Sequence, residues 1–456
     1  MRRSTFALAA LLVLAAIGCG PKTEETPTGT GGGEVASNVK QAPTGEGEVK
    51  GEIEVQAFKG GYGIDFYQQA AKEFDEKNGT KTTVDGGPRV WEQLRTRFVA
   101  NTPPDLTFPG WDMDHWALAD EGQLFGLDDA LKSKPYEGEG TWGDTFNPAL
   151  LKMGQANGKQ MVLPYYYMVM GWWYDPGVFQ KNGWTVPKTY DELLVLCEKI
   201  KAKGMAPITF QGKYPYYMIT GMLMPWARSI GGKDAVTAAQ NLEPGAWKSE
   251  AFLKAAKMID ELNKKGYFQQ GAVAMSHTDS QQEFLQGKAA MIPCGTWLES
   301  EMSKMMPPGA QMAFMLPPVV SGGAGDPTSV IIAIEPWMVP SKGKNPNGAV
   351  ALYKYMTSLT KAKQFVEQKG TLMAINGSDE VKLPKTLVEP ARVVKESKDA
   401  WAQMYREWYR AFEKEIENAM TAMLNGELTP EQFCDRVEAE AQKTKNDPDV
   451  IKRKVD

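Results

Sequence analysis

The stretch TYDELLVLCEKIKAKGMAPITF, residues 189–210, contains the pattern that decides the expected fold. Thr189 followed three residues later by Glu192 is a capping box, which marks the first turn of a helix. Apolar residues then recur at helical spacing until Gly204, a residue type that commonly ends helices. The short run APITF that follows has the composition of a buried strand. A helix followed at once by a strand is typical of an α/β fold.

The same alternation of strands and helices extends over most of the chain. Residues 51–58, GEIEVQAF, alternate apolar and polar side chains as a strand does, and residues 63–79 carry apolar side chains on one helical face. From 399 to 443 the pattern is almost entirely helical, with a second capping box at Thr429 and Gln432. We therefore predict an α/β fold with largely parallel sheets flanked by helices. The folded part exceeds what one hydrophobic core usually holds, so two lobes are expected.

The first eighteen residues have the layout of a secretory signal peptide. Two arginines precede an apolar run, residues 6–17, that is too short to span a bilayer as a stable helix. Gly18 and Cys19 follow directly, which resembles a bacterial lipobox, in which the cysteine is lipidated and becomes the first residue of the mature protein. We therefore expect a signal peptide at residues 1–18 and membrane anchoring through Cys19. The alternative is an ordinary signal peptide that contains a cysteine.

The next segment, residues 19–50, is rich in Gly, Thr, Pro and Glu and poor in large apolar side chains. Because it cannot bury enough surface to fold, we expect a disordered tether between the anchor and the folded body. The formal net charge of the whole chain is -5 at pH 7. A basic surface of the kind that binds nucleic acid is therefore not expected, and no nucleic-acid partner is predicted.

Sequence motifs of nucleophilic, metal-dependent and phosphate-binding enzymes are absent. There is no G-x-S-x-G elbow, and neither His115 nor His277 lies in a metal or triad pattern. The cysteines other than Cys19 have no metal-ligand or disulfide spacing and are expected to be small buried residues. No catalytic residue, metal or cofactor is predicted. One enzyme class stays open, because a glycosidase uses two carboxylates. The candidate pairs are Asp112 with Asp114 and Glu299 with Glu301.

Aromatic residues gather beside turn signals rather than inside periodic segments. The chain has 13 Trp and 16 Tyr, and many lie in FPGWDMDHW (108–116), LPYYYMVMGWWYDP (163–176) and FQGKYPYYM (210–218). Sugars present C–H faces that pack on aromatic rings and hydroxyl groups that need polar partners, so these clusters indicate a carbohydrate cleft. The competing interpretation is that the rings belong to the core. It is weakest for Trp111 and Trp297, which follow Gly or Thr just after strand-like runs.

Four long blocks of sequence carry a resemblance to a known family. They are FLQGKAAMIPCGTW (284–297), the segments 103–129 and 163–208, and EPWMVPSKGKNPNGAVALYKYMTS (335–358). The first is similar to the F-x-x-G-x-A-A-M-x-x-x-G-x-W block of extracellular solute-binding proteins of sugar ABC transporters. The others resemble, in that family's order, its first-lobe strand with a cleft tryptophan, its hinge-crossing strand with the helices after it, and the segment that returns to the first lobe.

That resemblance implies a type II periplasmic-binding-protein-like fold, with two α/β lobes joined at a hinge and the sugar held in the cleft between them. The first lobe is expected to contain residues 51–167 and 332–378, and the second residues 168–331 and 379–456. A ligand that touches both lobes selects the closed form over the open one. The membrane subunits of an ABC importer would then recognise the closed form.

Residues that match the family's binding motifs are expected to contact the sugar. Trp297 matches the stacking tryptophan of the second lobe and Trp111 the aromatic residue of the first, and either Tyr405 or Trp408 matches a further aromatic contact. The predicted ligand-binding residues are Trp297, Trp111, Asp112, Asp114, His115, Tyr166, Tyr216, Glu299 and Trp408. The loop FKGGYGIDF, residues 58–66, departs from the family because it has glycines in place of an obvious polar ligand.

The segment PCGTWLESEM, residues 293–302, looks closest to the branch of the family that binds N-acetylglucosamine or its β-linked disaccharide, chitobiose. Maltodextrin and glycerol-phosphate binders share most of these blocks, but few arginines lie near them, which argues against a phosphorylated ligand. The primary prediction is a monomeric, lipid-anchored, extracytoplasmic and non-catalytic protein that delivers a mono- or oligosaccharide to the permease subunits of an ABC importer. The alternatives are a secreted polysaccharide-degrading enzyme that uses the paired acids and an adhesive lipoprotein without a small ligand.

Overall fold

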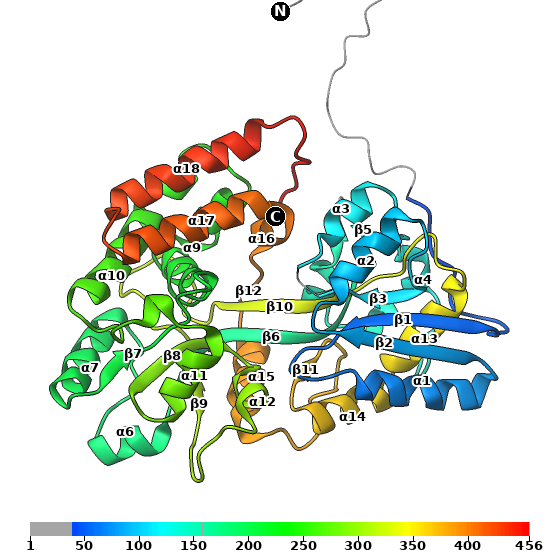
Figure 1. Ribbon diagram of the computed structural model, residues 1–456, viewed down its shortest axis with the longest axis horizontal. Helices are drawn as coiled ribbons and strands as arrows, with labels where there is room; N and C mark the ends of the chain where they lie inside the picture. Colours follow the sequence, from blue (N-terminus) through cyan, green and yellow to red (C-terminus); the bar gives the residue numbers. More distant parts are fainter. Residues whose placement is uncertain (1–38, 111, 157, 456) are drawn as a thin grey trace, which may run out of the picture. The chain divides into compact units, whose positions relative to one another are not determined.

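The computed structural model describes residues 39–110, 112–156 and 158–455, which belong to one compact unit. Two larger sheets organise these residues, one of three strands and one of seven. Helices flank both sheets (Figure 1), as the alternation in the sequence predicts. The α/β class is therefore confirmed. The predicted signal peptide and Cys19 lie outside the described residues.

The three-stranded sheet is entirely parallel, with β1 between its two neighbours. Its strands and the helices that connect them are, in chain order, β1 (Glu52–Phe58), α1 (Asp65–Asn78), β2 (Lys81–Gly87), α2 (Val90–Val99) and β3 (Leu106–Phe108). The apolar residues of the period-two pattern in β1 are buried. Helix α1 ends at Gly79, whose φ of 70° is in the left-handed region that glycine adopts easily. Both elements match the prediction.

The seven-stranded sheet is mixed. Its strands are β6 (Leu163–Tyr174), β7 (Ala206–Ile208), β8 (Ala289–Gly295), β9 (Ala313–Met315), β10 (Val330–Trp337), β11 (Leu372–Met373) and β12 (Ala400–Trp401). β6 is antiparallel to β8, β9, β10 and β11, whereas β7 with β8 and β10 with β12 are parallel pairs. The prediction of parallel pairing is therefore confirmed for the two strand pairs that do not include β6. All pairs that include β6 are antiparallel.

Strand β6 has different partners along its length. Leu163 to Met170 pair with β10, and Met170 to Tyr174 pair with β8 and partly with β9. Almost all of its residues are buried, as expected for a strand covered on both faces. β10 lies beside β6 (Figure 1), and directly after it Met338 exchanges two backbone hydrogen bonds with Thr107 of β3. The chain therefore passes from the seven-stranded to the three-stranded sheet at the end of β10.

The remaining helices cover the sheets or connect their strands. They are α3 (His115–Asp120), α4 (Asp128–Lys132), α5 (Pro148–Lys152), α6 (Pro176–Asn182), α7 (Tyr190–Ala202), α8 (Tyr216–Met218), α9 (Met224–Gln240), α10 (Glu250–Lys264), α11 (His277–Leu285), α12 (Leu298–Met302), α13 (Pro346–Met356), α14 (Leu359–Lys369), α15 (Lys385–Glu396), α16 (Met404–Trp408), α17 (Arg410–Leu424) and α18 (Pro430–Asn446). A small antiparallel pair consists of β4 (Gln155–Ala156) and β5 (Lys159–Gln160). After β10, α13 packs on α1 and β1, while α17 and α18 pack on each other and on α10.

The two predicted capping boxes have different outcomes. The box at Thr429 and Gln432 is complete, because each side chain accepts the backbone N–H of the other residue. At the start of α7, the hydroxyl of Thr189 accepts the N–H of Glu192 at 3.3 Å, as predicted. The carboxylate of Glu192, however, accepts the N–H of Lys188 at 2.7 Å instead of that of Thr189. The hydrogen bond from the backbone to the Glu192 side chain therefore comes from the residue before the one predicted.

The prediction that residues 19–50 form a disordered tether is wrong for residues 39–50. Ala42 is buried, and its N–H donates to the carbonyl of Gly126 at 2.8 Å. The N–H of Gly126 donates in turn to the carbonyl of Lys40 at 2.9 Å. Backbone hydrogen bonds therefore hold a segment that has few apolar side chains to bury. The earlier part of the predicted tether lies outside the described residues.

The cysteines of the described residues have the predicted structural role. Cys197, Cys294 and Cys434 are buried and unpaired. Burial raises the pKa of each thiol, so these side chains are uncharged and unreactive at neutral pH. Among residues 39–110, 112–156 and 158–455, no group of three or more His, Cys, Asp or Glu side chains is arranged to hold a metal ion.

A buried carboxyl group lies where β10 is irregular. Glu335 is 2% exposed, and the pairing of β10 with β6 shifts register between Ile334 and Pro336. Oε1 of Glu335 accepts hydrogen bonds from the Tyr67 hydroxyl at 2.8 Å and from Nε1 of Trp337 at 2.6 Å. Burial raises the pKa of Glu335 to about 7, although these hydrogen bonds favour the charged form. Folding therefore keeps a proton on Glu335 that the unfolded chain loses at lower pH.

We predict that the free energy of unfolding of the wild type falls relative to that of Glu335→Gln as the pH rises from about 5 to about 8. The folded pKa of Glu335 is about 7 against an ordinary value of 4.5, so its contribution is full below pH 4.5 and is lost as the pH rises through 7. Glutamine does not titrate and keeps an acceptor for Tyr67 and Trp337. Urea unfolding at both pH values should show a relative change of about 1–3 kcal/mol in favour of the variant. Parallel pH profiles would contradict this prediction.

Candidate functional site

Trp297 lies where β8 ends and α12 begins. It precedes the first residue of α12, and its side chain is partly buried. A Cβ atom at Gly295 would lie 1.9 Å from Cζ3 of Trp297, so the indole ring occupies the space that a side chain at Gly295 would need. The G-x-W spacing therefore has a physical cause: glycine allows the ring to fold back over the end of the strand.

Two tyrosines and an arginine form a row of contacts that begins at Trp297. The ring centre of Tyr217 is 6.2 Å from that of Trp297, and Tyr216 stacks on Tyr217 at 4.1 Å. The guanidinium of Arg406, in α16, lies 4.7 Å from the ring centre of Tyr216. Its Nε donates to Oε1 of Glu413 at 2.6 Å, so the charge of Arg406 is already paired. Rings and a paired cation from three elements thus form a continuous series.

Glu407, the residue after Arg406 in α16, lies between this row of contacts and His115. Oε2 of Glu407 is 3.9 Å from Nε2 of His115, which is buried at the start of α3. Burial, together with the nearby positive charge of Arg410, lowers the pKa of His115 to about 3. The imidazole is therefore neutral at physiological pH. We call the whole series the aromatic strip, which consists of Trp297, Tyr217, Tyr216, Arg406, Glu407 and His115.

Buried polar atoms without a hydrogen-bond partner among the described residues gather at the His115 end of the aromatic strip. They are His115 Nδ1, Trp116 Nε1, Glu407 Oε2, Trp408 Nε1 and Arg453 Nη1. Folded proteins leave few such atoms unpaired, so they mark places where water or a polar ligand bonds. This set contains both donors and acceptors. Hydroxyl groups, which donate and accept, are suited to it.

Of the predicted polar loop 112–115, the structure brings only His115 into the aromatic strip. The carboxylate of Asp114 caps α3 by accepting a backbone N–H. Asp112 is exposed, and its backbone carbonyl accepts a hydrogen bond from Arg95. Trp111 lies outside the described residues.

Of the two alternatives in α16, Trp408 lies near the end of the aromatic strip and Tyr405 lies in the core. Tyr405 is 1% exposed, and its ring packs on those of Trp247 and Phe412. Trp408 is partly buried and packs against the hydrophobic cluster that contains Trp116 of α3. Of the two rings, that of Trp408 is therefore the less buried.

Tyr166 is buried in β6, and the side chain of Tyr62 covers it. The two ring centres are 5.0 Å apart, and Tyr166 also stacks on Phe365. Tyr62 belongs to the glycine-containing loop after β1, where the sequence analysis found no polar ligand. Its buried hydroxyl adjoins Thr371 but has no hydrogen bond of normal length to a described residue. The sequence signal for this placement is a single tyrosine between glycines directly after a strand, and it was not recognised as such.

The two acids that follow Trp297 face different partners. The carboxylate of Glu299 accepts a hydrogen bond from the hydroxyl of Thr386 in α15. Oε2 of Glu301 accepts a hydrogen bond from Nε2 of Gln281 at 2.8 Å. They therefore do not form a pair around a common substrate atom, and this arrangement gives no support to a glycosidase that uses them together.

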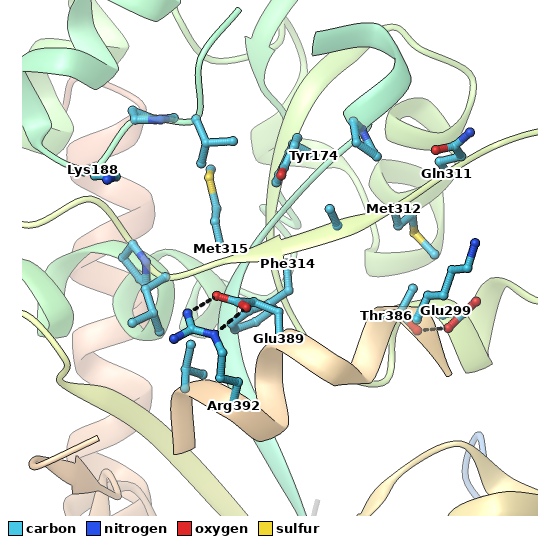
Figure 2. Close-up of a pocket in the computed structure, with 18 of the residues that line it drawn as sticks. Tyr174, Lys188, Glu299, Gln311, Met312, Phe314, Met315, Thr386, Glu389 and Arg392 are labelled. Atoms are coloured by element: carbon cyan, nitrogen blue, oxygen red, sulfur yellow. Dashed lines mark hydrogen bonds and ion pairs between the residues drawn. The ribbon is translucent and has the colours of Figure 1, made fainter. Parts of the chain in front are cut away.

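Glu299 lines a groove of about 990 Å³ between β9 and α15 (Figure 2). Phe314 and Met315 of β9 form part of its apolar wall, and Arg392 of α15 is ion-paired with Glu389 at its edge. The residues that line the groove include none of the aromatic strip. Glu299 is therefore placed apart from Trp297, although the two are close in sequence.

The fold and the aromatic strip define a class of protein. Two sheets with their own helices are linked by the long strands β6 and β10, and side chains from separate segments meet in a site of aromatic rings, a neutral imidazole and charged groups that are paired with other residues. This arrangement is typical of a two-lobed ligand-binding protein. A model of the bacterial extracellular solute-binding proteins matches residues 60–399, and the chain belongs to that family.

Individual relatives agree with this assignment. The chain is 30% identical over 382 residues to the diacetylchitobiose-binding protein NgcE of Streptomyces coelicolor, covering 82% of this chain and 80% of the relative. A solved chitin-oligosaccharide-binding protein superposes with a TM-score of 0.67 at 22% identity, covering 83% of this chain and 94% of that one. RafE of Streptococcus pneumoniae gives 0.69 at 20% identity, covering 86% and 98%. These neighbours confirm the predicted two-lobed, periplasmic-binding-protein-like fold.

The segment 447–455 joins α16 to α3 beside the aromatic strip. Arg453 is buried, and its guanidinium donates to the carboxylate of Asp120 and lies 5.3 Å from the ring centre of Trp116. Its backbone N–H donates to the hydroxyl of Tyr409 at 2.9 Å. Arg453 therefore connects α3, which begins with His115, to the end of α16, which carries Arg406 and Glu407.

We predict that Arg453→Met lowers the free energy of unfolding by about 2–4 kcal/mol, because it leaves the half-buried carboxylate of Asp120 without its charged partner. Lys454→Met is the matched control, since Lys454 is exposed and changes stability little. Urea unfolding of both variants and the wild type measures the difference. Equal midpoints for the two variants would show that the Arg453 contact does not stabilise the fold.

Proposed function

We propose that this protein is the substrate-binding component of an ABC importer and that it captures a neutral sugar without catalysing a reaction. The observation that carries the proposal is the aromatic strip, in which the partly buried rings of Trp297 and Tyr216 provide faces for sugar C–H groups and the buried ring of Tyr217 packs against both. The polar atoms around His115 provide hydrogen bonds for hydroxyl groups. The relationship to a diacetylchitobiose-binding protein supports N-acetylglucosamine or chitobiose as the ligand.

The charges beside the aromatic strip favour a neutral ligand. Arg406 is paired with Glu413. Elsewhere in the fold, the buried Arg228 packs on Trp401 and donates from Nε to Oδ2 of Asp399 at 2.5 Å. A phosphorylated sugar is normally held by arginines that are free to bind it bidentately. Because carboxylates already occupy these guanidinium groups, a maltodextrin or an amino sugar fits the site better than a sugar phosphate.

The ligand cleft lies, in this proposal, between a first lobe of residues 51–167 and 332–378 and a second lobe of residues 168–331 and 379–456. The change of partners along β6 near Met170 and the return of the chain at Met338 support this division. Of the predicted contacts, Trp297, Tyr216, His115 and Trp408 would touch the sugar. Asp112, Asp114, Tyr166 and Glu299 have other structural partners, and Trp111 retains its proposed role as the aromatic contact of the first lobe.

Membrane attachment through Cys19 completes the proposal. The family consists of extracellular proteins, and in the described part of the chain no helix is long and apolar enough to cross a bilayer. Residues 1–18 would direct export, and lipidated Cys19 would hold a monomer near the permease by a tether that reaches residue 38.

We predict that Trp297→Ala weakens sugar binding by about 1–3 kcal/mol and leaves the fold intact, since a stacking ring contributes affinity more than core packing. Calorimetric titration with chitobiose, cellobiose, maltose and a sugar phosphate measures the affinity. Thermal unfolding shows whether the variant is folded. Trp184→Ala is the control, because Trp184 is also partly buried but packs on Phe179 outside the aromatic strip. If no saccharide binds the wild type, the proposed function is wrong.

We predict that Cys19→Ser releases the protein from the membrane fraction of the producing bacterium into the soluble fraction, because serine cannot carry the thioether-linked lipid. Sugar affinity should be unchanged, since the described fold begins at residue 39. Immunoblots of fractionated cells measure the distribution. A variant that remains in the membrane fraction to the same extent as the wild type would contradict lipid anchoring at Cys19.

A further inference from the structure

The backbone of segment 447–455 is anchored at two points to the proposed second lobe. The segment follows α18 and returns beside α16 (Figure 1). The hydroxyl of Tyr409, directly after α16, accepts the N–H of Arg453 at 2.9 Å and donates to its carbonyl at 3.2 Å. The side chain of Asn241, directly after α9, accepts the N–H of Val455 at 2.8 Å and donates to its carbonyl at 3.0 Å. Each anchor therefore binds both backbone groups of one residue.

The side chain of Arg453 reaches in the other direction, to α3 of the proposed first lobe. Its Nη2 donates to the carboxylate of Asp120 and, at 3.4 Å, to the carbonyl of Trp116. The side chain of Arg453 is 4% exposed and that of Asp120 is 19% exposed. An ion pair shielded in this way is screened little by salt, and the loss of one partner leaves a buried charge unpaired. Arg453 thus joins α3 to the anchored segment by a contact that is expensive to break.

Apolar contacts between α16 and α3 accompany the ion pair. Met404 and Trp408 of α16 are partly buried and pack against the hydrophobic cluster that contains Trp116 of α3. Apolar contacts have no preferred direction and tolerate small shifts of one helix against another. The charge-assisted hydrogen bonds of a guanidinium require one geometry. The ion pair is therefore the contact that is most sensitive to a separation of α3 from α16.

We propose that segment 447–455 is a latch that restrains the opening of the two lobes, with Arg453 as its releasable contact. Asn241 and Tyr409 keep the backbone of the latch on the second lobe. The Arg453 guanidinium separates from Asp120 when α3 moves away. A contact that is made in the closed form and lost in the open form shifts the equilibrium between them. The inference rests on the proposed function, from which it takes the two lobes, but it requires no bound sugar.

The latch acts on the aromatic strip through the position of α3. This helix begins with His115, whose Nε2 is 3.9 Å from Oε2 of Glu407 in α16. Holding α3 beside α16 keeps these two groups together before a sugar arrives. A ligand that binds only the closed form has an apparent affinity reduced by the fraction of protein that is closed. Arg453 is in this sense a positioning residue, because releasing it lowers that fraction.

The test measures the distance between the lobes without sugar. Spin labels are attached to Val99→Cys in α2 and Ala439→Cys in α18, both at exposed positions, in protein that also carries Cys19→Ser. Arg453→Met and Asp120→Ala remove the ion pair from opposite sides. Each should raise the ratio of long to short distances by about fivefold or more. The double variant should raise it no further, because both changes break the same contact.

Two neighbouring exposed residues provide matched controls. Lys454→Met and Glu121→Gln each remove a charge next to one partner of the ion pair and should keep the wild-type distances. All distances are measured well below the thermal unfolding midpoint of each variant, and Asp120→Ala decides the test if Arg453→Met does not fold. If the folded latch variants keep the wild-type distances, or if the double variant opens further than both single variants, the inference is overturned.

Sugar release separates the latch from the proposed function. In stopped-flow measurements with chitobiose, Arg453→Met and Asp120→Ala should each release the sugar about fivefold faster or more, because the lobes open before release. Release at the wild-type rate from variants whose lobes have opened would overturn the action of the latch on the site. If chitobiose, cellobiose and maltose all fail to bind the wild type while the variants open, the latch stands and the proposed function is overturned.

Discussion

The pairing of β6 is the constraint on which the rest of the structure depends. A strand of 12 residues that is buried along almost its whole length must have its backbone groups hydrogen-bonded, because water cannot reach them. β10 and β11 satisfy its first part, and β8 and β9 satisfy its last part. β8 ends opposite Met170 of β6, and this end places Trp297. The position of the site is therefore set by the register of one strand.

Local signals in the sequence predicted the elements that depend on neighbouring residues. The period-two pattern of β1, the glycine stop of α1 and the complete capping box at Thr429 all involve groups within a few positions of each other. The order of residues 39–50 depends instead on hydrogen bonds to Gly126, far along the chain. Composition alone cannot reveal such a partner, which is why this segment had the pattern of a tether.

The site shows the same division. The position of Trp297 at the end of a strand could be predicted, because glycine two positions earlier and a strand before it form a local motif. Glu299 and Glu301 are separated by one residue on a helix, so they point in different directions, and the sequence does not show which residues each one meets. Their partners are Thr386 and Gln281, which tertiary structure brings to the two carboxylates. Tyr62 was missed for a similar reason, since only the fold places it over β6.

The pairing of charges around the aromatic strip explains how charged side chains can lie buried beside it. Burying an unpaired charge costs several kcal/mol, whereas a charge with a hydrogen-bonded partner is buried at a much lower cost. Arg406 with Glu413 and Arg453 with Asp120 are such pairs, and the imidazole of His115 stays neutral. Glu407 is the remaining charge of the strip, and its Oε2 lies 3.7 Å from Nη2 of Arg410. Beside these pairs, the strip contains ring faces and the dipole of a neutral imidazole. Dipoles bond strongly to hydroxyl and amide groups once water is excluded, and they do not require a charge on the ligand. The ion pairs thus allow charged side chains to lie in a buried region that also contains ring faces and a neutral imidazole.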